Sequence, residues 1–407
     1  MRQPFHLMAK PTSYQCNLDC DYCFYLEKEQ YYKPRGKDKI TAMNNDVLRD
    51  YIKQYIASQD TQEVNFAWQG GEPTTAGLDF FRKVIKYQQK FAHGKKVSNS
   101  LQTNGVLIND EWATFLKEHE FLVGVSVDGP REIHDYYRVS QGGKPTFNKV
   151  MKGIEALKRH SVEYNTLTVV NNVNIEKPIE VYNFLKSIGS TFLQFIPIVE
   201  QQEVGITNPS LIFPAAKTEK RLMPFAVQSG DEYGRFMITI FDEWVKKDVG
   251  KIYVQAFEEA LSKWAGYGGS LCLFQEKCGQ AMVIERNGDI YSCDHYVYPE
   301  YRLGNILEEK MTKLATSKLQ RKFGDDKANV GKHCTECEFR FACHGGCPKH
   351  RIHDNDDGTR QNHLCSGYYN LFKHINPYMK YMVNELRQNR SPMNIMRQPE
   401  AVERFRQ

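Results

Sequence analysis

The sequence predicts an α/β protein: a partial barrel of six strand–helix units, then a small cysteine-rich domain and a helical tail. Three observations predict this class. Short apolar runs alternate with amphipathic stretches of helical length up to about residue 200, which is typical of repeated βα units. Polar or glycine-rich loops follow the apolar runs. Eight of the eleven cysteines lie beyond Trp264, where the alternation has ended.

The six expected strands are short apolar runs: Phe5–Lys10, Val64–Gln69, Val97–Gln102, Phe121–Val127, Tyr164–Val170 and Thr191–Pro197. Between them, stretches such as NDVLRDYIKQYIASQ and FNKVMKGIEALKRH repeat apolar residues three or four positions apart, as amphipathic helices do. Because each strand returns through a helix, the strands are expected to pair in parallel. The loops QGGEP, TNG, SVDGP and NN should therefore meet the first cysteine loop at the carboxyl ends of the strands.

The remainder of the chain is less regular. Residues from about 201 to 234 break the alternation and indicate an insertion or long loop, and helical patterns resume at RFMITIFDEWVKKDV and VQAFEEALSKW. In ERNGDIYSC, the pair Asn287-Gly288 suits a hairpin with a tight two-residue turn. The expected domains are a barrel over 1–235, a helical connection over 236–270, the cysteine-rich domain over 271–366 and the tail over 367–407.

Composition excludes several classes of protein. Apolar residues at 41% and charged residues at 25% are typical of soluble globular proteins. The net charge of +5 comes from basic residues dispersed among acidic ones, which argues against a nucleic-acid partner. No apolar segment resembles a signal peptide or a membrane span, so a cytoplasmic location is expected. In that reducing compartment, eleven cysteines favour metal or catalytic thiols over disulfides.

The C-terminal cysteines form two possible sets of four thiols. On counting alone, two structural zinc sites and two fully ligated [4Fe–4S] clusters fit equally well. The eight residues are Cys272, Cys278, Cys293, Cys334, Cys337, Cys343, Cys347 and Cys365.

The N-terminal cysteines are different, because Cys16, Cys20 and Cys23 in CNLDCDYC supply only three thiols. Three thiolate ligands leave one coordination position open, which a metal needs if it is to bind a reactant. The alternative is that a distant cysteine or histidine completes an ordinary site.

Together these motifs resemble the radical S-adenosylmethionine (SAM) enzymes, which have TIM-like partial barrels. The resemblance rests on the three cysteines, on the aromatics Phe24 and Tyr25, and on GGEP at Gly70–Pro73. The C-terminal cysteine spacing, with Gly288 between Cys278 and Cys293, is similar to the SPASM extension of that family. More narrowly, KPTSYQCNLDCDYCFYLEK, FLVGVSVDGPREIHDYYR and GDIYSCDHYVYPEYRLGNI resemble the anaerobic sulfatase-maturating enzymes, over about residues 5 to 380.

The resemblance implies a set of cofactor residues. Cys16, Cys20 and Cys23 would hold a [4Fe–4S] cluster whose open iron binds the amino and carboxylate groups of SAM. Paired glycines permit close approach, a carboxylate complements an ammonium group, and a guanidinium binds a carboxylate with two hydrogen bonds. The implied SAM-binding residues are Tyr25, Gln69, Gly70, Gly71, Glu72, Ser126, Arg138 and Leu193, with Asn104 and Asp128 as further candidates to line the site.

The resemblance also implies two auxiliary clusters and a catalytic base. One cluster would be held by Cys272, Cys278, Cys293 and Cys347, and the other by Cys334, Cys337, Cys343 and Cys365, which makes three [4Fe–4S] clusters in total. Asp294 matches the family's general base, a role that suits a carboxylate in a desolvated pocket.

The implied reaction is oxidation of a cysteine or serine in an unfolded sulfatase polypeptide to formylglycine, through hydrogen abstraction by a 5′-deoxyadenosyl radical. A flavodoxin- or ferredoxin-like protein would donate electrons. Two alternatives remain open: a SPASM peptide maturase that crosslinks or oxidises another residue, and a non-enzymatic adaptor stapled by zinc.

Overall fold

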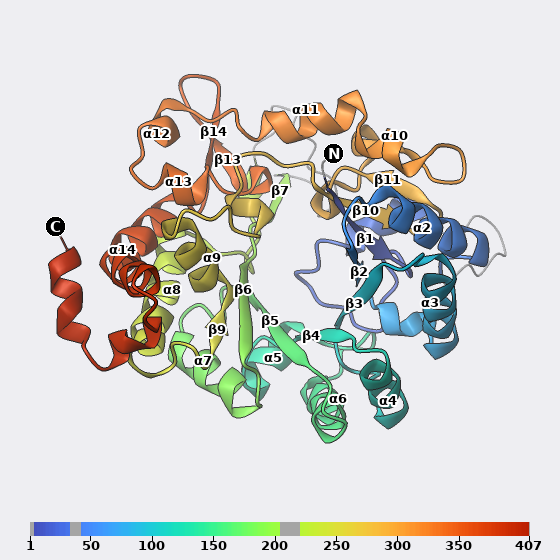
Figure 1. The fold of residues 1–407 in the computed structure, drawn as a ribbon, viewed down its shortest axis with the longest axis horizontal. Coiled ribbons are helices and arrows are strands. Elements are labelled where there is room, and N and C mark those ends of the chain that lie inside the picture. Colours follow the sequence, from blue (N-terminus) through green and yellow to red (C-terminus); the bar gives the residue numbers. More distant parts are fainter. Residues whose placement is uncertain (1–3, 33–41, 204–219, 407) are drawn as a thin grey trace. The chain divides into compact units, whose positions relative to one another are not determined.

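The computed structural model describes residues 4–32, 42–203 and 220–406, and Figure 1 shows the order of the elements along the chain. The chain divides into two compact units. The first unit comprises Met1–Ser126, His134–Tyr164 and Cys278–Asp326. The second unit comprises Val127–Ile133, Asn165–Lys277 and Lys327–Gln407. Each unit therefore combines barrel residues with part of the cysteine-rich region.

The first unit contains a sheet with the strand order β12-β11-β10-β1-β2-β3-β4. Four of the predicted strands form its parallel part, and a later segment extends it, because β10 pairs in parallel with β1. The strands are β1 (His6–Lys10), β2 (Glu63–Trp68), β3 (Lys96–Thr103), β4 (Leu122–Ser126), β10 (Ala281–Glu285), β11 (Asp289–Tyr291) and β12 (Arg302–Asn305). The pairing of β10 with β1 brings the start of the cysteine-rich region beside the N-terminal strand.

The helices of the first unit follow the strands as the apolar periodicity predicts. The long ones are α2 (Asn45–Ser58), α3 (Leu78–Phe91), α4 (Asp110–Glu118) and α6 (Phe147–Arg159). A further helix as long as α4 is α11 (Lys318–Asp326), and shorter ones are α1 (Glu29–Tyr32) and α10 (Met311–Ala315). Helix α5 (Arg131–Tyr137) contributes residues to both units.

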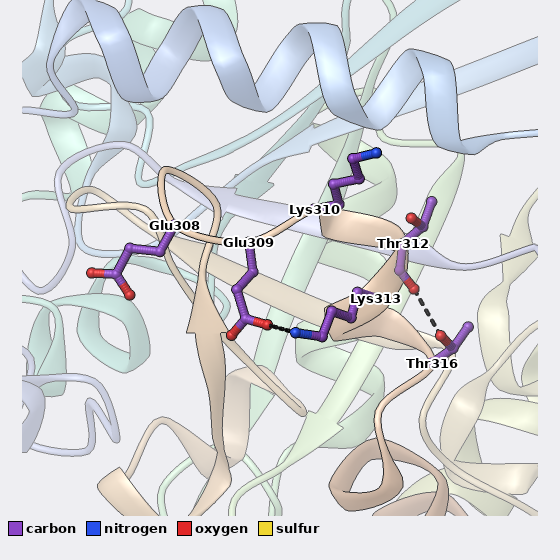
Figure 2. Close-up of a pocket in the computed structure, with 6 residues that line it drawn as sticks. All are labelled: Glu308, Glu309, Lys310, Thr312, Lys313 and Thr316. Atoms are coloured by element: carbon purple, nitrogen blue, oxygen red, sulfur yellow. Dashed lines mark hydrogen bonds and ion pairs between the residues drawn. The ribbon is translucent and has the colours of Figure 1, made fainter.

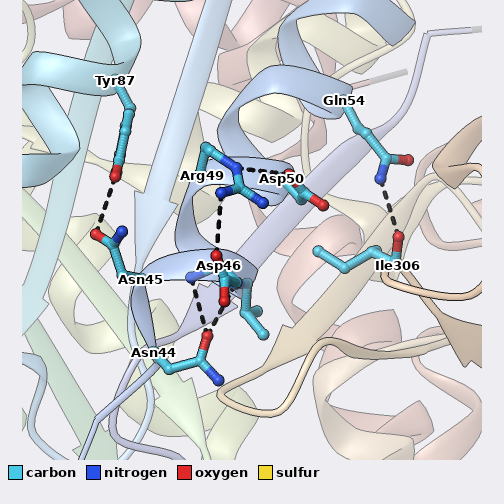
Figure 3. A network of polar contacts seen from close by, with 9 residues as sticks. Asn44, Asn45, Asp46, Arg49, Asp50, Gln54, Tyr87 and Ile306 are labelled. Atoms are coloured by element: carbon cyan, nitrogen blue, oxygen red, sulfur yellow. Dashed lines mark hydrogen bonds and ion pairs between the residues drawn. The ribbon is translucent and has the colours of Figure 1, made fainter.

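The start of α2 shows how local sequence fixes a helix end. The Asn44 side chain accepts hydrogen bonds from the backbone N–H groups of Asp46 and Val47, both at 3.0 Å, and so satisfies donors that have no partner within the helix. Farther along the same helix, Gln54 Nε2 donates to the Ile306 carbonyl at 2.9 Å. Figure 3 shows this network, which connects α2 to the segment after β12.

The core of the first unit is aromatic. Tyr51, Phe66, Trp68 and Phe81 are each fully buried, and Trp68 packs edge-on against both Tyr51 and Phe81. The Trp68 indole N–H donates to Asn99 Oδ1 at 2.9 Å, which satisfies a buried polar group. This packing stabilises the carboxyl end of β2, from which the GGEP loop begins.

The hairpin predicted near residue 288 is confirmed, but its predicted two-residue turn is wrong. Ile284 pairs with Ile290, so three residues, Arg286 to Gly288, connect β10 to β11. Only Gly288 in this loop has a positive φ, of +90°, whereas a two-residue type I′ turn needs two such residues. Asn287 instead accepts the Asp289 N–H through its side chain at 3.1 Å. The Asn-Gly pair therefore forms the end of a three-residue loop.

The second unit contains β5 (Tyr164–Val170, of which Tyr164 belongs to the first unit), β6 (Phe192–Pro197) and β9 (Tyr253–Val254), paired in parallel. Its long helices are α7 (Pro178–Ser187), α8 (Gly230–Lys247), α9 (Gln255–Trp264) and α14 (Cys365–Arg387), and its short ones are α12 (Lys332–Thr335) and α13 (Arg340–Cys343). Antiparallel pairs are β7 (Gln201–Glu203) with β8 (Lys220–Leu222) and β13 (Arg351–Asp354) with β14 (Arg360–Asn362).

Two glycines let α8 and α14 approach closely. A Cβ atom on Gly367 would lie 1.9 Å from the Gly230 carbonyl oxygen, and one on Gly234 would lie 2.7 Å from Gly367 Cα.

The predicted helical tail is confirmed by α14. The predicted insertion at 201–234 contains β7, β8 and the start of α8, while its residues 204–219 lie outside the described residues. Among the helices described, none combines the length and apolar character that crossing a membrane requires.

Candidate functional site

The GGEP loop packs directly against the residue that precedes the first cysteine. The Glu72 N–H donates to the Gln15 carbonyl at 2.8 Å. Gly71 has a φ of +44°, and a Cβ atom there would lie 2.0 Å from the Gln15 oxygen. Glycine is therefore required for both conformation and space. The loop after β2 thereby supports the cysteine loop after β1.

Replacement of Gly71 by alanine tests this support. We expect Gly71→Ala to lose the iron that the N-terminal cysteines are predicted to bind, because the new methyl group would displace the backbone at Gln15. Gly77→Ala is the matched control, since Gly77 has a φ of +81° but nothing within 4 Å of its Cβ position. Iron content and SAM binding are measured after anaerobic reconstitution. Equal iron and SAM binding in the two variants would contradict the assignment.

Cys16, Cys20 and Cys23 all lie in the loop after β1, and two hydrogen-bond donors point at the first of them. Cys16 Sγ accepts from the Leu18 N–H at 3.3 Å and from Asn104 Nδ2 at 3.6 Å. Burial first, and then the Glu72 carboxylate, raise the pKa of the Cys16 thiol to about 12, although the two hydrogen bonds act to lower it. The donors thus favour the thiolate, which is the form that binds iron.

Opposing effects also act on the pKa of the Cys23 thiol. Burial raises the pKa of its thiol, whereas the N–H groups of Tyr25 and Leu26 and the charges of Arg138 and Lys10 lower it. Arg138 is only 7% exposed, and its guanidinium lies 5.5 Å from the centroid of the Tyr22 ring. A buried cation near the cysteine loop fits the predicted contact with the SAM carboxylate, which stays a prediction.

The Glu72 carboxylate accepts hydrogen bonds from several groups of the protein itself. It is fully buried and accepts hydrogen bonds from Thr74 Oγ1 at 2.6 Å, Thr103 Oγ1 at 2.7 Å and the Asn104 N–H at 2.6 Å. Burial raises its pKa, and these hydrogen bonds act against the rise. The carboxylate thus connects the loop after β2 to the loop after β3. Its predicted contact with the SAM amino group remains untested.

A second cluster, of charged and aromatic side chains, surrounds Lys10, which is the buried last residue of β1. Lys10 is 1% exposed, and its Nζ lies 3.8 Å from Asp294 Oδ2 and 4.6 Å from the centroid of the Tyr25 ring. The Tyr25 hydroxyl donates to Glu285, which is the residue paired with Lys10 across β1 and β10. Burial lowers the pKa of Lys10, and nearby negative groups, Asp294 first, raise it. This cluster places the predicted base beside the cysteine loop.

Lys10 and Glu285 are absent from the residues that the sequence predicts for the site. The only signal for Lys10 is a charged residue at the end of an otherwise apolar run. Glu285 offers no signal until the register of β10 against β1 is known.

The other predicted site residues are distributed over the two units. Ser126 ends β4, and Gln69, whose N–H donates to the Ala9 carbonyl at 2.9 Å, follows β2. Leu193 is fully buried on β6 of the second unit. Asp128, also in the second unit, accepts a hydrogen bond from the Val169 N–H at 3.0 Å through Oδ1. The first unit therefore gathers the three cysteines, the GGEP loop, Asn104, Tyr25, Arg138 and Asp294.

Four C-terminal cysteines lie together in the second unit. Burial and the neighbouring Cys365 and Cys337 thiols raise the pKa of Cys334, and burial raises that of Cys343 to about 12, with Cys365 as the next cause. The four thiols, of Cys334, Cys337, Cys343 and Cys365, are therefore close enough to affect one another electrostatically. In the described residues, no three His, Cys, Asp or Glu side chains are close enough to hold one metal ion. A four-iron cluster binds each thiolate through a different iron, so it accommodates more widely spaced sulfurs.

The remaining cysteines are divided between the units. Cys278 and Cys293 belong to the first unit, and Cys272 and Cys347 to the second. Within the second unit, the buried Lys327 ammonium donates to the Cys272 carbonyl at 2.6 Å. The assignment of these four to one cluster stays a prediction.

Figure 2 shows a pocket beside α10 that involves none of these groups. Glu309 and Lys313 form an ion pair within it. Its lining consists of Glu308, Glu309, Lys310, Thr312, Lys313 and Thr316.

Comparison with known proteins identifies the family. Residues 11–185 match the radical SAM superfamily, and residues 272–338 match the SPASM iron–sulfur cluster-binding domain. The chain is 45% identical over 397 residues to a serine-type anaerobic sulfatase-maturating enzyme from Bacteroides thetaiotaomicron, covering 97% of this chain and 95% of that protein. The chain belongs to the anaerobic sulfatase-maturating enzymes.

Other members of this family align over most of the chain. A cysteine-type enzyme from Clostridium novyi is 34% identical, covering 93% of this chain and 97% of that protein. The solved structure of native anSMEcpe with bound AdoMet and Cp18Cys peptide has a TM-score of 0.80 at 33% identity, covering 94% of this chain and 99% of that one. The radical SAM and SPASM architecture predicted from the sequence is thus confirmed. The matches to these two domains also support the predicted binding of SAM and of iron–sulfur clusters.

Proposed function

We propose that this sulfatase-maturating enzyme oxidises a serine or cysteine side chain in an unfolded sulfatase segment to formylglycine, with serine as the preferred target. The observation that carries the proposal is the 45% identity, over 97% of the chain, to a serine-type enzyme. Cysteine-type relatives match less closely, at 34% for Clostridium novyi. The thiols, and the pair formed by buried Lys10 and partly exposed Asp294, would supply the required groups.

Three [4Fe–4S] clusters are part of the proposal. Cys16, Cys20 and Cys23 would hold one with an open iron, and two sets of four cysteines would hold the others. The fit rests on the donor set: the three thiols share one loop, and the amides of Leu18 and Asn104 favour the Cys16 thiolate. Once reduced and with SAM bound, the cluster held by Cys16, Cys20 and Cys23 would supply a 5′-deoxyadenosyl radical able to take one hydrogen atom from the target Cβ. A flavodoxin- or ferredoxin-like donor would provide the reducing electron.

The protein's own residues complete the oxidation. Asp294 would accept the proton from the target hydroxyl or thiol, and Lys10 would keep that carboxylate oriented, with its Nζ 3.8 Å from Oδ2. Loss of one hydrogen atom, one proton and one electron converts the serine CH2–OH group into an aldehyde. The two sets of four C-terminal cysteines would hold auxiliary clusters able to accept that electron.

The experiment is an anaerobic assay with three sulfatase-derived peptides that differ only in the target residue: serine, cysteine or alanine. We expect the serine peptide to lose two hydrogen atoms and to react with an aldehyde reagent. The cysteine peptide should give the same aldehyde more slowly, through a thioaldehyde that water hydrolyses with release of hydrogen sulfide. The alanine peptide, which has no side-chain proton for Asp294 to accept, should give no aldehyde. Absence of aldehyde from both reactive peptides, under conditions in which SAM is cleaved, would contradict the proposed function.

A further inference from the structure

We propose that Asn104 sets the reduction potential of the N-terminal cluster, by donating a hydrogen bond from Nδ2 to the Cys16 sulfur, and that Glu72 holds Asn104 in place. The inference rests on the proposed function only in taking Cys16 as a ligand of that cluster.

The geometry orients the Asn104 side chain without ambiguity. Its Oδ1 accepts the Val106 N–H at 3.0 Å, so its Nδ2 must be the atom that faces the cysteine loop. There Nδ2 lies 2.7 Å from Asn17 Oδ1 and 3.6 Å from Cys16 Sγ. An amide nitrogen carries two hydrogens, so Nδ2 can donate to Asn17 Oδ1 and to Cys16 Sγ at the same time. Asn104 is 7% exposed, which keeps water from replacing the donor.

Glu72 anchors the backbone of Asn104. Its Oε2 accepts the Asn104 N–H at 2.6 Å, while its Oε1 accepts the hydroxyls of Thr74 and Thr103. These charge-assisted hydrogen bonds are buried, and so they are stronger than neutral ones at the surface. The acidic residue of GGEP thereby fixes the distance between the TNG loop and the cysteine loop. Glu72 acts on the cluster through Asn104 and is a positioning residue.

The expected direction of the effect follows from charge. Reduction adds one negative charge to a cluster, and an N–H group pointing at a ligand sulfur stabilises the more negative state. Hydrogen bonds to the sulfurs are among the factors that set cluster potentials. Removal of the Asn104 donor should therefore lower the potential and make the cluster harder to reduce. Leu18 N–H remains as the second donor to the same sulfur, at 3.3 Å.

The test is a potentiometric titration of the reconstituted enzyme, followed by electron paramagnetic resonance. The signal that changes when SAM is added identifies the N-terminal cluster, and the other signals are internal controls. In Asn104→Ala we expect the equilibrium constant for one-electron reduction to fall about tenfold, a shift of ~59 mV to lower potential. Asn65→Ala is the matched control, because Asn65 is exposed on β2 and bonds Ser98. Its potential should equal that of the wild type.

Two further variants complete the design. Thr103→Val removes a hydroxyl that donates to the Glu72 carboxylate without changing the charge near the cluster, and we expect its potential to move in the same direction by a smaller amount. Asn104→Ser is measured if Asn104→Ala holds no cluster. An unchanged potential in an Asn104 variant with full iron would overturn the inference, and so would loss of the cluster from both Asn104 variants. If the Asn104 variants have a shifted potential but the wild-type enzyme forms no aldehyde, only the proposed function is overturned.

Discussion

Replacement of Cys16, Cys20 and Cys23 together by alanine will abolish SAM cleavage while the C-terminal cysteines keep their iron. The three thiols lie in one loop of the first unit, and four others, Cys334, Cys337, Cys343 and Cys365, lie in the second. Because the two groups are carried by different units, loss of one set should leave the other folded. If the enzyme holds the three proposed clusters of four irons, the variant should retain about two thirds of the iron.

The measurement combines iron and sulfide analysis with quantification of 5′-deoxyadenosine under reducing conditions. Asp21→Ala is the control, because Asp21 is exposed in the same loop and supplies no thiol. It should keep full iron and full cleavage. SAM cleavage by the triple variant, or loss of all iron from it, would refute the assignment of the N-terminal cysteines.

Asp294→Asn should give the second large effect, a fall in aldehyde formation of about 10²- to 10⁴-fold, the usual contribution of a general base. Asparagine keeps the shape of the side chain but cannot accept the proton from the target residue. Lys10 then loses its anionic partner at 3.8 Å, although Glu285 remains beside it as a second source of negative charge. The clusters should assemble normally, because Asp294 is not a thiol ligand.

The informative quantity is the ratio of 5′-deoxyadenosine to aldehyde. In the wild type the two should form in equal amounts, whereas Asp294→Asn should still cleave SAM and yield little aldehyde. Glu300→Gln is the matched control, since Glu300 is an exposed carboxylate six residues along the same segment. Wild-type aldehyde formation by Asp294→Asn would remove the aspartate from the mechanism.

The regular part of the fold could be predicted because each predicted strand is a short apolar run with a helix-length periodic stretch after it. All six predicted strands occur as β1 to β6, with ends that differ by at most one residue. The hairpin at Gly288 could be located but its loop length could not. An Asn-Gly pair does not show whether the preceding Arg286 belongs to a strand, and here only Gly288, not Asn287, has the left-handed backbone that a two-residue turn would need at both positions.

The site could be predicted only where a motif is contiguous. Cys16, Cys20, Cys23 and the GGEP loop are short local patterns, and the structure brings the two loops into contact. Lys10 and Glu285 are 275 positions apart and become neighbours only through the parallel register of β1 with β10. Sequence spacing contains no information about such a pairing. For the same reason, the engagement of Glu72 by the loop after β3 could not be foreseen.

The most direct measurement of the central claim is the fate of the target hydrogen. A sulfatase peptide carrying a serine deuterated at Cβ is incubated anaerobically with the reduced enzyme and SAM, and both products are analysed by mass spectrometry. If an open-site cluster in the first unit generates the oxidising radical, one deuterium per turnover will appear in 5′-deoxyadenosine, with an equal amount of formylglycine. Formylglycine accompanied by unlabelled 5′-deoxyadenosine would contradict the account.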